Sequence, residues 1–286
     1  MNKIVAALIA LFMLVAFSPL MGSFEGRTHY SMAGGRYSEF GLYPALVNDT
    51  SLPAGANLSP ELLSAGAGAP DMWRQYPYFI DRAHNQTYTR DQGVYWLAMA
   101  AKARQNNAWD NVSYFLGIAS HYWLDAVTIP HHDNAMAYFE SIYGSDQGYN
   151  AWYDLHNHFE SQAYYYEVLL SRDNYRDPSN VNLQDYINNV AMPILNDFIR
   201  KTKGPSLDNK DGWLFEWADG SSSSEDYIRK TLDYGGVHVE VMFPRDCQLT
   251  KSCVDLAALL LYNACVRVLD NVPDSVDDLI SQYRPI

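Results

Sequence analysis

The stretch WDNVSYFLGIASHYWLDAVTIPHH, residues 109–132, decides the fold of this chain. Its apolar residues recur at helical spacing, so it predicts a long, mostly buried helix that ends at Pro130. Within it, His121 and Asp125 are spaced i, i+4, which places both side chains on one helix face, a turn apart. The stretch therefore predicts an imidazole and a carboxylate side by side on a mostly buried helix.

A second pair of this kind follows in HNHFE, where His156 and Glu160 repeat the same spacing, and the doublet His131 and His132 lies between the pairs. One such pair also occurs as a solvated helix pair worth about 0.2–0.5 kcal/mol. A lone histidine on an apolar helix is usually an ordinary core residue. Two imidazole–carboxylate pairs joined by a histidine doublet instead favour a multinuclear zinc site.

The composition is that of a globular protein, with 286 residues, of which 48% are hydrophobic and 19% charged. Further helices are expected near 90–105, 150–171, 182–203 and 254–270. Residues 24–70 are rich in Gly, Pro and Ala and are expected to form loops, with a short helix from His29 as one option. The chain has no βαβ alternation and no Gly-rich phosphate loop. The sequence predicts an all-α, single-domain, multi-helix bundle, with one small strand at 237–243.

The N-terminus has the pattern of a secretory signal peptide. Lys3 is followed by an apolar run, residues 4–17, and then by small residues up to Ser23. We expect a signal peptide at 1–23 and a secreted mature chain that begins at Phe24. An uncleaved membrane anchor is the alternative, although the run is shorter than the ~20 residues of a spanning helix.

The net charge indicates which partners the protein could bind, and the cysteines indicate whether it could form a disulfide. The formal net charge of −13 argues against broad binding to nucleic acid duplexes. It does not exclude a phosphate substrate, because bound divalent metals reverse the field inside a cleft. In an exported protein Cys247 and Cys253 could close a disulfide, whereas Cys265 lies in an apolar stretch and is expected to be a buried thiol.

The spacing of these residues resembles the zinc-dependent phospholipase C family, which shares its fold with fungal single-strand-specific zinc nucleases. That family is all-α and binds three zinc ions in a cleft. Its signature is a His, an aromatic residue, an Asp four after the His, a Pro, a second His ten after the first, and then His-x-x-x-Glu. The residues that fit this order are His121, Tyr122, Asp125, His131, His156 and Glu160.

The resemblance also implies ligands upstream of the long helix. His29 matches the family's first-helix histidine, Asp71 its next aspartate and His84 the histidine after that. The family uses the backbone of its mature N-terminal residue as a ligand, and Phe24 would take that place.

Three metal sites follow from the resemblance. One zinc would take Asp71, His84, His121 and Asp125; a second would take the Phe24 backbone, His29 and the bridging Asp125; a third would take His131, His156 and Glu160. Counting from His121 selects His131 for the third site, whereas counting from Pro130 selects His132. Asn134 supports His131 and is a candidate substrate-binding residue.

The implied reaction is hydrolysis of a phosphodiester by a metal-bound hydroxide, with Asp71 as the residue that orients or deprotonates the attacking water. Phospholipid, reached at a membrane surface, is the expected substrate. The 22 Tyr and 7 Trp could hold a choline ammonium or stack on nucleobases. The alternatives are a zinc nuclease or nucleotidase acting on single strands, and a non-catalytic binding protein stabilised by metal.

Overall fold

The computed structural model describes residues 25–34, 41–48, 56–73, 85–128, 131, 135–150, 152–153, 156, 181–201, 227–234, 237–244, 248–270 and 275–285. Most of this part is helical: α2 (Glu25–Ala33), α3 (Leu42–Asn48), α4 (Pro60–Trp73), α5 (Gln86–Gln105), α6 (Trp109–Ala126), α7 (Ala135–Tyr143), α10 (Leu183–Tyr186), α11 (Met192–Lys201), α13 (Gln248–Asp270) and α14 (Asp277–Gln282). The prediction of a mostly α, multi-helix fold is therefore confirmed.

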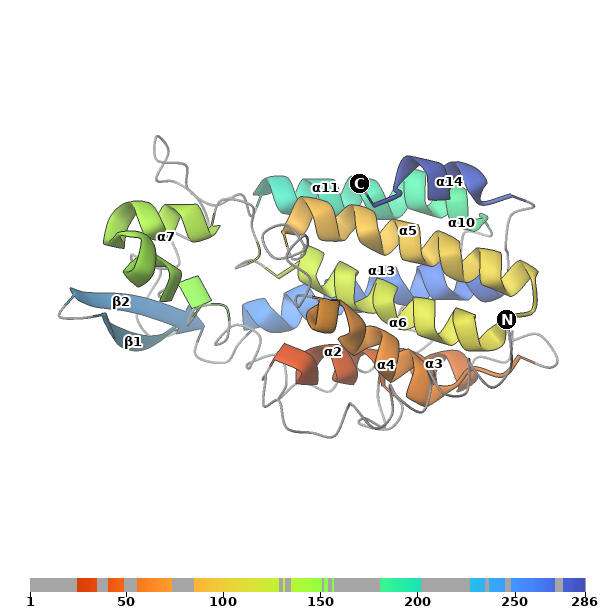
Figure 1. Ribbon diagram of the computed structural model, residues 1–286, viewed down its shortest axis with the longest axis horizontal. Coiled ribbons are helices and arrows are strands. Elements are labelled where there is room, and N and C mark those ends of the chain that lie inside the picture. Colours follow the sequence, from red (N-terminus) through yellow and green to blue (C-terminus); the bar gives the residue numbers. More distant parts are fainter. Residues whose placement is uncertain are drawn as a thin grey trace.

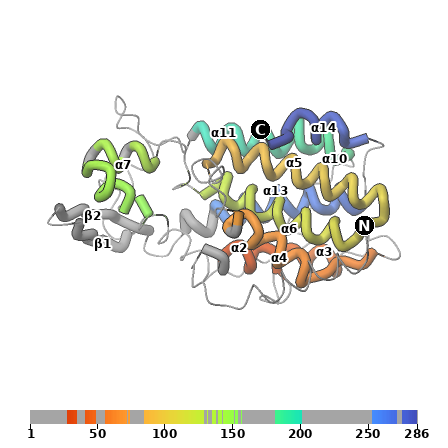
Figure 2. Tube along the Cα trace, in the orientation of Figure 1, coloured from red at the N-terminus to blue at the C-terminus, as the bar shows by residue number. Residues whose placement is uncertain are grey.

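Helix α6 occupies the centre of the bundle, with α4 on one side, α5 on the other, and α13 in contact with both α5 and α6 (Figure 1). Figure 2 shows that the orange N-terminal helices and the blue C-terminal helix α14 lie on opposite sides of α5 and α6. The end of the chain is tied to α5 by Lys102 Nζ, which lies 3.1 Å from Asp277 Oδ1. The bundle therefore holds α6 among segments from both ends of the chain.

The central position of α6 follows from its residues, which are almost all apolar or small from Leu116 onward. Trp123 is fully buried and donates its indole N–H to the Arg90 carbonyl at 3.1 Å. A Cβ at Gly93 of α5 would lie 2.0 Å from Trp123 Cδ1, so only glycine leaves room for this indole. The predicted long buried helix is confirmed, and its burial carries His121 and Asp125 into the core.

Residues 24–70 do not form loops alone, because they contain α2, α3 and most of α4. The Gly and Ala residues that indicated loops serve close helix packing instead. A Cβ at Gly66 would lie 2.1 Å from the Tyr114 carbonyl oxygen, and one at Gly117 would lie 2.1 Å from that of Leu63. The backbones of α4 and α6 therefore touch at a glycine crossing that any larger side chain would open.

The helix expected at 182–203 is present but irregular. A π-helical segment, Ile187–Ala191, separates α10 from α11, and Pro193 follows directly in the first turn of α11. Proline has no N–H to donate to the preceding turn, which accounts for a change of helical register at this point. The helix expected at 150–171 lies largely outside the described residues.

The C-terminal part adds a β-hairpin to the helices. Strand β1 (Tyr227–Tyr234) pairs antiparallel with β2 (Val237–Pro244), with Tyr227 opposite Pro244 and Tyr234 opposite Val237. The strand expected at 237–243 is confirmed, whereas its partner was not foreseen. The all-α class thus describes the bundle but not this hairpin.

Cys253 and Cys265 are free thiols on α13, both turned into the core. The prediction that Cys253 could form a disulfide with Cys247 is therefore wrong. Cys253 is a free thiol, because α13 packs its side chain inward. The expectation of a buried thiol at Cys265 is confirmed. No helix in the described ranges is long and apolar enough to cross a membrane.

Candidate metal centre

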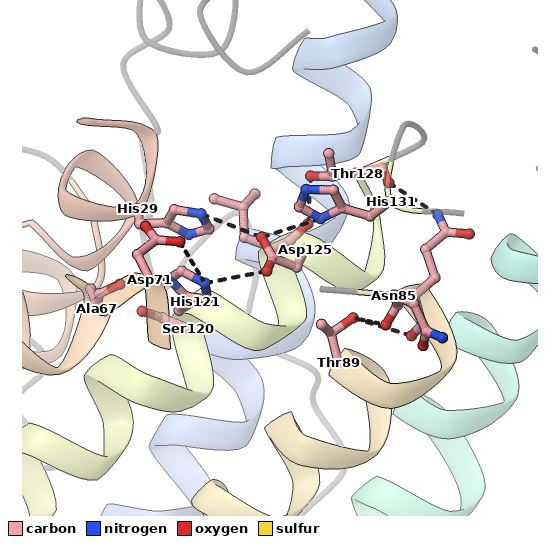
Figure 3. A network of polar contacts seen from close by, with 12 residues as sticks. His29, Ala67, Asp71, Asn85, Thr89, Ser120, His121, Asp125, Thr128 and His131 are labelled. Atoms are coloured by element: carbon pink, nitrogen blue, oxygen red, sulfur yellow. Dashed lines mark hydrogen bonds and ion pairs between the residues drawn. The ribbon is translucent and has the colours of Figure 1, made fainter. Parts of the chain in front are cut away.

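The last turns of α6 hold the centre of a buried polar cluster. His121 and Asp125 are both fully buried, and His121 Nε2 lies 3.2 Å from Asp125 Oδ2. A carboxylate removed from water in this way is costly unless partners compensate for its charge. The cluster around Asp125 supplies such partners from several helices (Figure 3).

Helix α4 fixes the orientation of the His121 ring. His121 Nδ1 lies 2.7 Å from the carbonyl oxygen of Ala67. Because a carbonyl only accepts hydrogen bonds, Nδ1 must carry the proton, and Nε2 is left to face the carboxylates. This is the arrangement of a histidine ligand that donates the N–H of one ring nitrogen to a neighbouring acceptor and offers its other nitrogen to a metal.

Asp125 connects two imidazoles through different oxygens. Its Oδ1 lies 3.3 Å from His29 Nε2, whereas its Oδ2 faces His121. The two rings stack with centroids 3.7 Å apart and planes 15° apart. His29 reaches this place from α2, which packs so closely on α4 that a Cβ at Gly68 would lie 2.4 Å from the Tyr30 hydroxyl oxygen. Asp125 therefore has the geometry of a bridging carboxylate.

Asp71, at the end of α4, is the more open carboxylate of the cluster. Its side chain is 14% exposed, and its Oδ1 lies 3.8 Å from His121 Nε2. Donor atoms of His29, Asp71 and His121 all lie within 4.8 Å of one another. Part of the Asp71 side chain therefore reaches the surface, whereas both of its carboxylate oxygens are buried beside the imidazoles.

The electrostatics of the cluster favour a positive charge. Burial of His121 lowers its pKa, but the charges of Asp125 and Asp71 outweigh this effect and raise the pKa to about 9. The carboxylates therefore stabilise a cation at His121 Nε2. A bound divalent metal ion would take the place of that proton.

His131 and His156 form a second pair next to Asp125. His131 Nδ1 lies 3.5 Å from Asp125 Oδ1, and its Nε2 lies 2.6 Å from His156 Nε2. Both rings are buried, and the plane of His156 is parallel to that of Trp152 within 2°. The Nε2 atoms of His131 and His156 therefore face each other, whereas the Nδ1 atom of His131 faces Asp125.

The donor set fits zinc. A tetrahedral zinc with bonds of about 2.0–2.1 Å to nitrogen and oxygen holds its ligand atoms about 3.3 Å apart. The separations from Asp125 to His29 and His121 are 3.3 and 3.2 Å. The contact between the Nε2 atoms of His131 and His156 is shorter, so a zinc ion held by both would replace it.

Six of the predicted site residues meet in this cluster: His29, Asp71, His121, Asp125, His131 and His156. The others lie outside the described residues, namely Phe24, His84, His132, Asn134 and Glu160.

Two contributors to the cluster were not foreseen. The Ala67 carbonyl has no signal in the sequence, since any residue carries one. Gln86 is fully buried at the start of α5 and donates from Nε2 to the Thr128 carbonyl at 3.3 Å, and the same carbonyl accepts from the His131 backbone N–H at 3.0 Å. Gln86 therefore supports the turn that delivers His131. The sequence carries no signal for this role, because the burial of Gln86 follows from tertiary packing.

Comparison with protein families found one match, in which residues 42–204 fit the family described as zinc dependent phospholipase C. The matched range covers more than half of the chain and includes Asp71, His121, Asp125, His131 and His156. No curated protein and no solved structure matches the chain.

Proposed function

Because the chain belongs to the zinc-dependent phospholipase C family and is a phospholipase C-like hydrolase, we propose that the cluster around Asp125 is its catalytic centre. The observation that carries this proposal is the bridging geometry of Asp125, whose two oxygens face His29 and His121. Metal ions held close together by such a carboxylate suit hydrolysis of a phosphodiester.

Zinc is the cofactor that the family and the donor set support, and we propose three ions. The buried carboxylate Asp125 would be shared by two of them. The first zinc would be held by Asp71, His84, His121 and Asp125, the second by the Phe24 backbone, His29 and Asp125, and the third by His131, His156 and Glu160. The separations within the described part of each set support these assignments.

Zinc bound here would supply Lewis-acid stabilisation of the phosphate charge and lower the pKa of a bound water. Asp71 is the better candidate to act on the attacking water, because its side chain is 14% exposed whereas that of Asp125 is fully buried. Both carboxylate oxygens of Asp71 are themselves buried, so this water would be one that enters the cluster. Asp71 orients the attacking water and takes its proton, in the role of a general base. Asp125 stays ionised and keeps the imidazoles of His29 and His121 in place.

The family implies a phospholipid substrate. In the proposed reaction the water oxygen bonds to phosphorus and the bond from phosphorus to the glycerol oxygen breaks. The proton returns to that glycerol oxygen, so the products are diacylglycerol and the phosphorylated headgroup. Asn134 is proposed to contact the substrate.

We propose further that residues 1–23 are removed during secretion and that 24–286 form the catalytic domain. His29 lies on α2, which starts at Glu25, so a new N-terminus at Phe24 would begin next to the helix that carries a cluster residue. N-terminal sequencing of the exported protein tests this, and a start other than Phe24 would remove its backbone from the ligand set.

The reaction is tested by assaying the zinc-loaded protein on a phospholipid and on single-stranded nucleic acid, with and without chelator. We expect chelator-sensitive release of diacylglycerol. Asp71→Asn should lower kcat by about 10²–10⁴-fold, with folding retained, whereas Asp146→Asn, at an exposed position, should not. Cleavage of nucleic acid alone would instead indicate a nuclease. Full zinc content with neither activity would indicate a binding protein.

A further inference from the structure

Three aromatic side chains, Tyr149, Trp152 and Tyr153, form a patch beside the metal centre. The rings of Tyr149 and Tyr153 stack with centroids 6.0 Å apart and planes 13° apart, and Tyr149 lies 5.8 Å from Trp152. The Trp152 ring in turn stacks on His156 at 5.4 Å. This aromatic patch is therefore a continuous series of rings that ends on a residue of the site.

The outer rings of the aromatic patch face solvent. Tyr149 is 46% exposed and Tyr153 is 39% exposed, whereas His156 is 2% exposed. The other large apolar side chains that are exposed in the described ranges, Val47 and Ile194, lie on α3 and α11. Within the part of the chain that is described, two such neighbours occur together only at this patch.

The segment that carries the aromatic patch has no Lys or Arg. The sequence has no Lys or Arg from residue 105 to residue 171, a range that includes most of the site. Acidic side chains are close: Asp146 is exposed on the same segment, and a Cβ at Gly148 would lie 2.3 Å from the Cα of Glu140. The segment itself therefore offers no electrostatic attraction to an anionic surface.

We propose that the aromatic patch docks the protein onto the interface of a zwitterionic phospholipid bilayer. Tyr and Trp combine an apolar ring with a polar edge and accumulate at the headgroup level of membranes. They bind there without needing charge, which matches the acidic surroundings of the patch. The inference rests on the proposed function, in which a phospholipid of that bilayer is the substrate.

Docking through the aromatic patch would place the metal centre close to the bilayer surface. Trp152 touches both the exposed Tyr149 and the buried His156. Contact of the Tyr rings with the headgroup layer would therefore bring phosphodiesters next to the pair His131 and His156. Ile194, by contrast, is exposed on a different element, α11.

The test uses the zinc-loaded full chain and vesicles of phosphatidylcholine that contain a dansyl lipid, with tryptophan-to-dansyl energy transfer recorded before measurable hydrolysis. The double variant Tyr149→Ser with Tyr153→Ser should bind about tenfold more weakly than the wild type, since two half-buried rings lose their apolar contact with lipid. Ile194→Ser, which removes an exposed apolar side chain elsewhere, should bind like the wild type. Zinc content should be the same in all three.

Varying the salt concentration and the lipid charge distinguishes docking through aromatic rings from electrostatic docking. Binding of the wild type should persist in high salt and should weaken when phosphatidylglycerol is added. Binding that strengthens with phosphatidylglycerol and fades in salt would overturn the proposal, as would equal binding by the double variant.

Hydrolysis of a short-chain phosphatidylcholine below its aggregation concentration completes the test. The double variant should retain the wild-type rate on these monomers while losing activity on vesicles. An equal loss on both would mean that the rings bind the substrate headgroup itself, and the docking proposal would fail. Vesicle binding by a wild type that hydrolyses no phospholipid would reject the proposed function and leave the docking surface standing.

Discussion

The Nδ1 of His121 lies 2.7 Å from the carbonyl oxygen of Ala67. One helix therefore sets the proton position on a histidine of another, and the Nε2 atom is left to face Asp71 and Asp125. The contact exists because α4 and α6 approach to backbone distance at their glycine crossing. The first prediction follows from that crossing.

Gly117→Ala should destabilise the protein and loosen the metal centre. A Cβ there would lie 2.1 Å from the Leu63 carbonyl oxygen, so the helices must separate and the Ala67 carbonyl moves away from His121. We expect a loss of about 1–3 kcal/mol in the free energy of unfolding, measured by urea denaturation, and weaker retention of zinc. Asn111→Ala, on the exposed face of α6, should change stability by no more than about 0.5 kcal/mol.

Asp125→Asn should release more zinc than His156→Ala. Asp125 is proposed as a ligand of two ions, and an amide neither carries the charge nor bridges as a carboxylate does. His156 is proposed as a ligand of one ion. Elemental analysis of the purified variants gives the count per chain. Equal zinc loss in both would refute the bridging role.

Gln86→Met should weaken the zinc held by His131 and His156 while leaving the fold intact. The substitution keeps the length of the side chain but removes the donor that holds the Thr128 carbonyl. Loss of such a supporting contact typically lowers metal affinity by about 10–100-fold. Competition with a chromogenic chelator measures this.

Lys102→Met is the matched control on α5, because it removes only an exposed ion pair with Asp277. Its zinc should be released like that of the wild type. If Gln86→Met also behaves like the wild type, Gln86 does not position His131.

The thiols of Cys253 and Cys265 should resist alkylation in the folded protein. Burial raises the pKa of each thiol to about 12, whereas the thiol of an unfolded cysteine has a pKa of about 8.5. Between these two pKa values only the unfolded chain forms thiolate. The contribution of the buried thiols to the free energy of unfolding is therefore fully present below the lower pKa, and it is lost as the pH rises toward the upper one. Mass spectrometry after alkylation at pH 8, with and without urea, checks the shielding. Rapid labelling of both sites without urea would contradict it.

The helices differ in how clearly the sequence predicts them. The helix α6 was predictable because its apolar periodicity is long and unbroken. The helices α3 and α4 were missed, and α2 was foreseen only as a short helix from His29, because Gly, Ala and Pro usually indicate loops. In the fold, Gly66 and Gly68 instead make room for Tyr114 and Tyr30. Helix propensity is a weak guide where such packing decides the outcome.

The disulfide was misjudged for a related reason. Its cysteines are close in sequence, but α13 turns Cys253 into the core. The direction of a side chain on a helix depends on what the helix packs against, which sequence spacing does not report.

By itself the sequence determined the helical class and the pairing of His121 with Asp125, because both depend on spacing along one helix. It also suggested which distant residues could join them. Only the tertiary structure decided that His29, Asp71 and His131 lie around Asp125, that the Ala67 carbonyl sets the tautomer of His121, and that Tyr149 and Tyr153 reach the surface beside His156. These relations join separate segments of the chain, and their distances arise from how helices pack rather than from the order of residues.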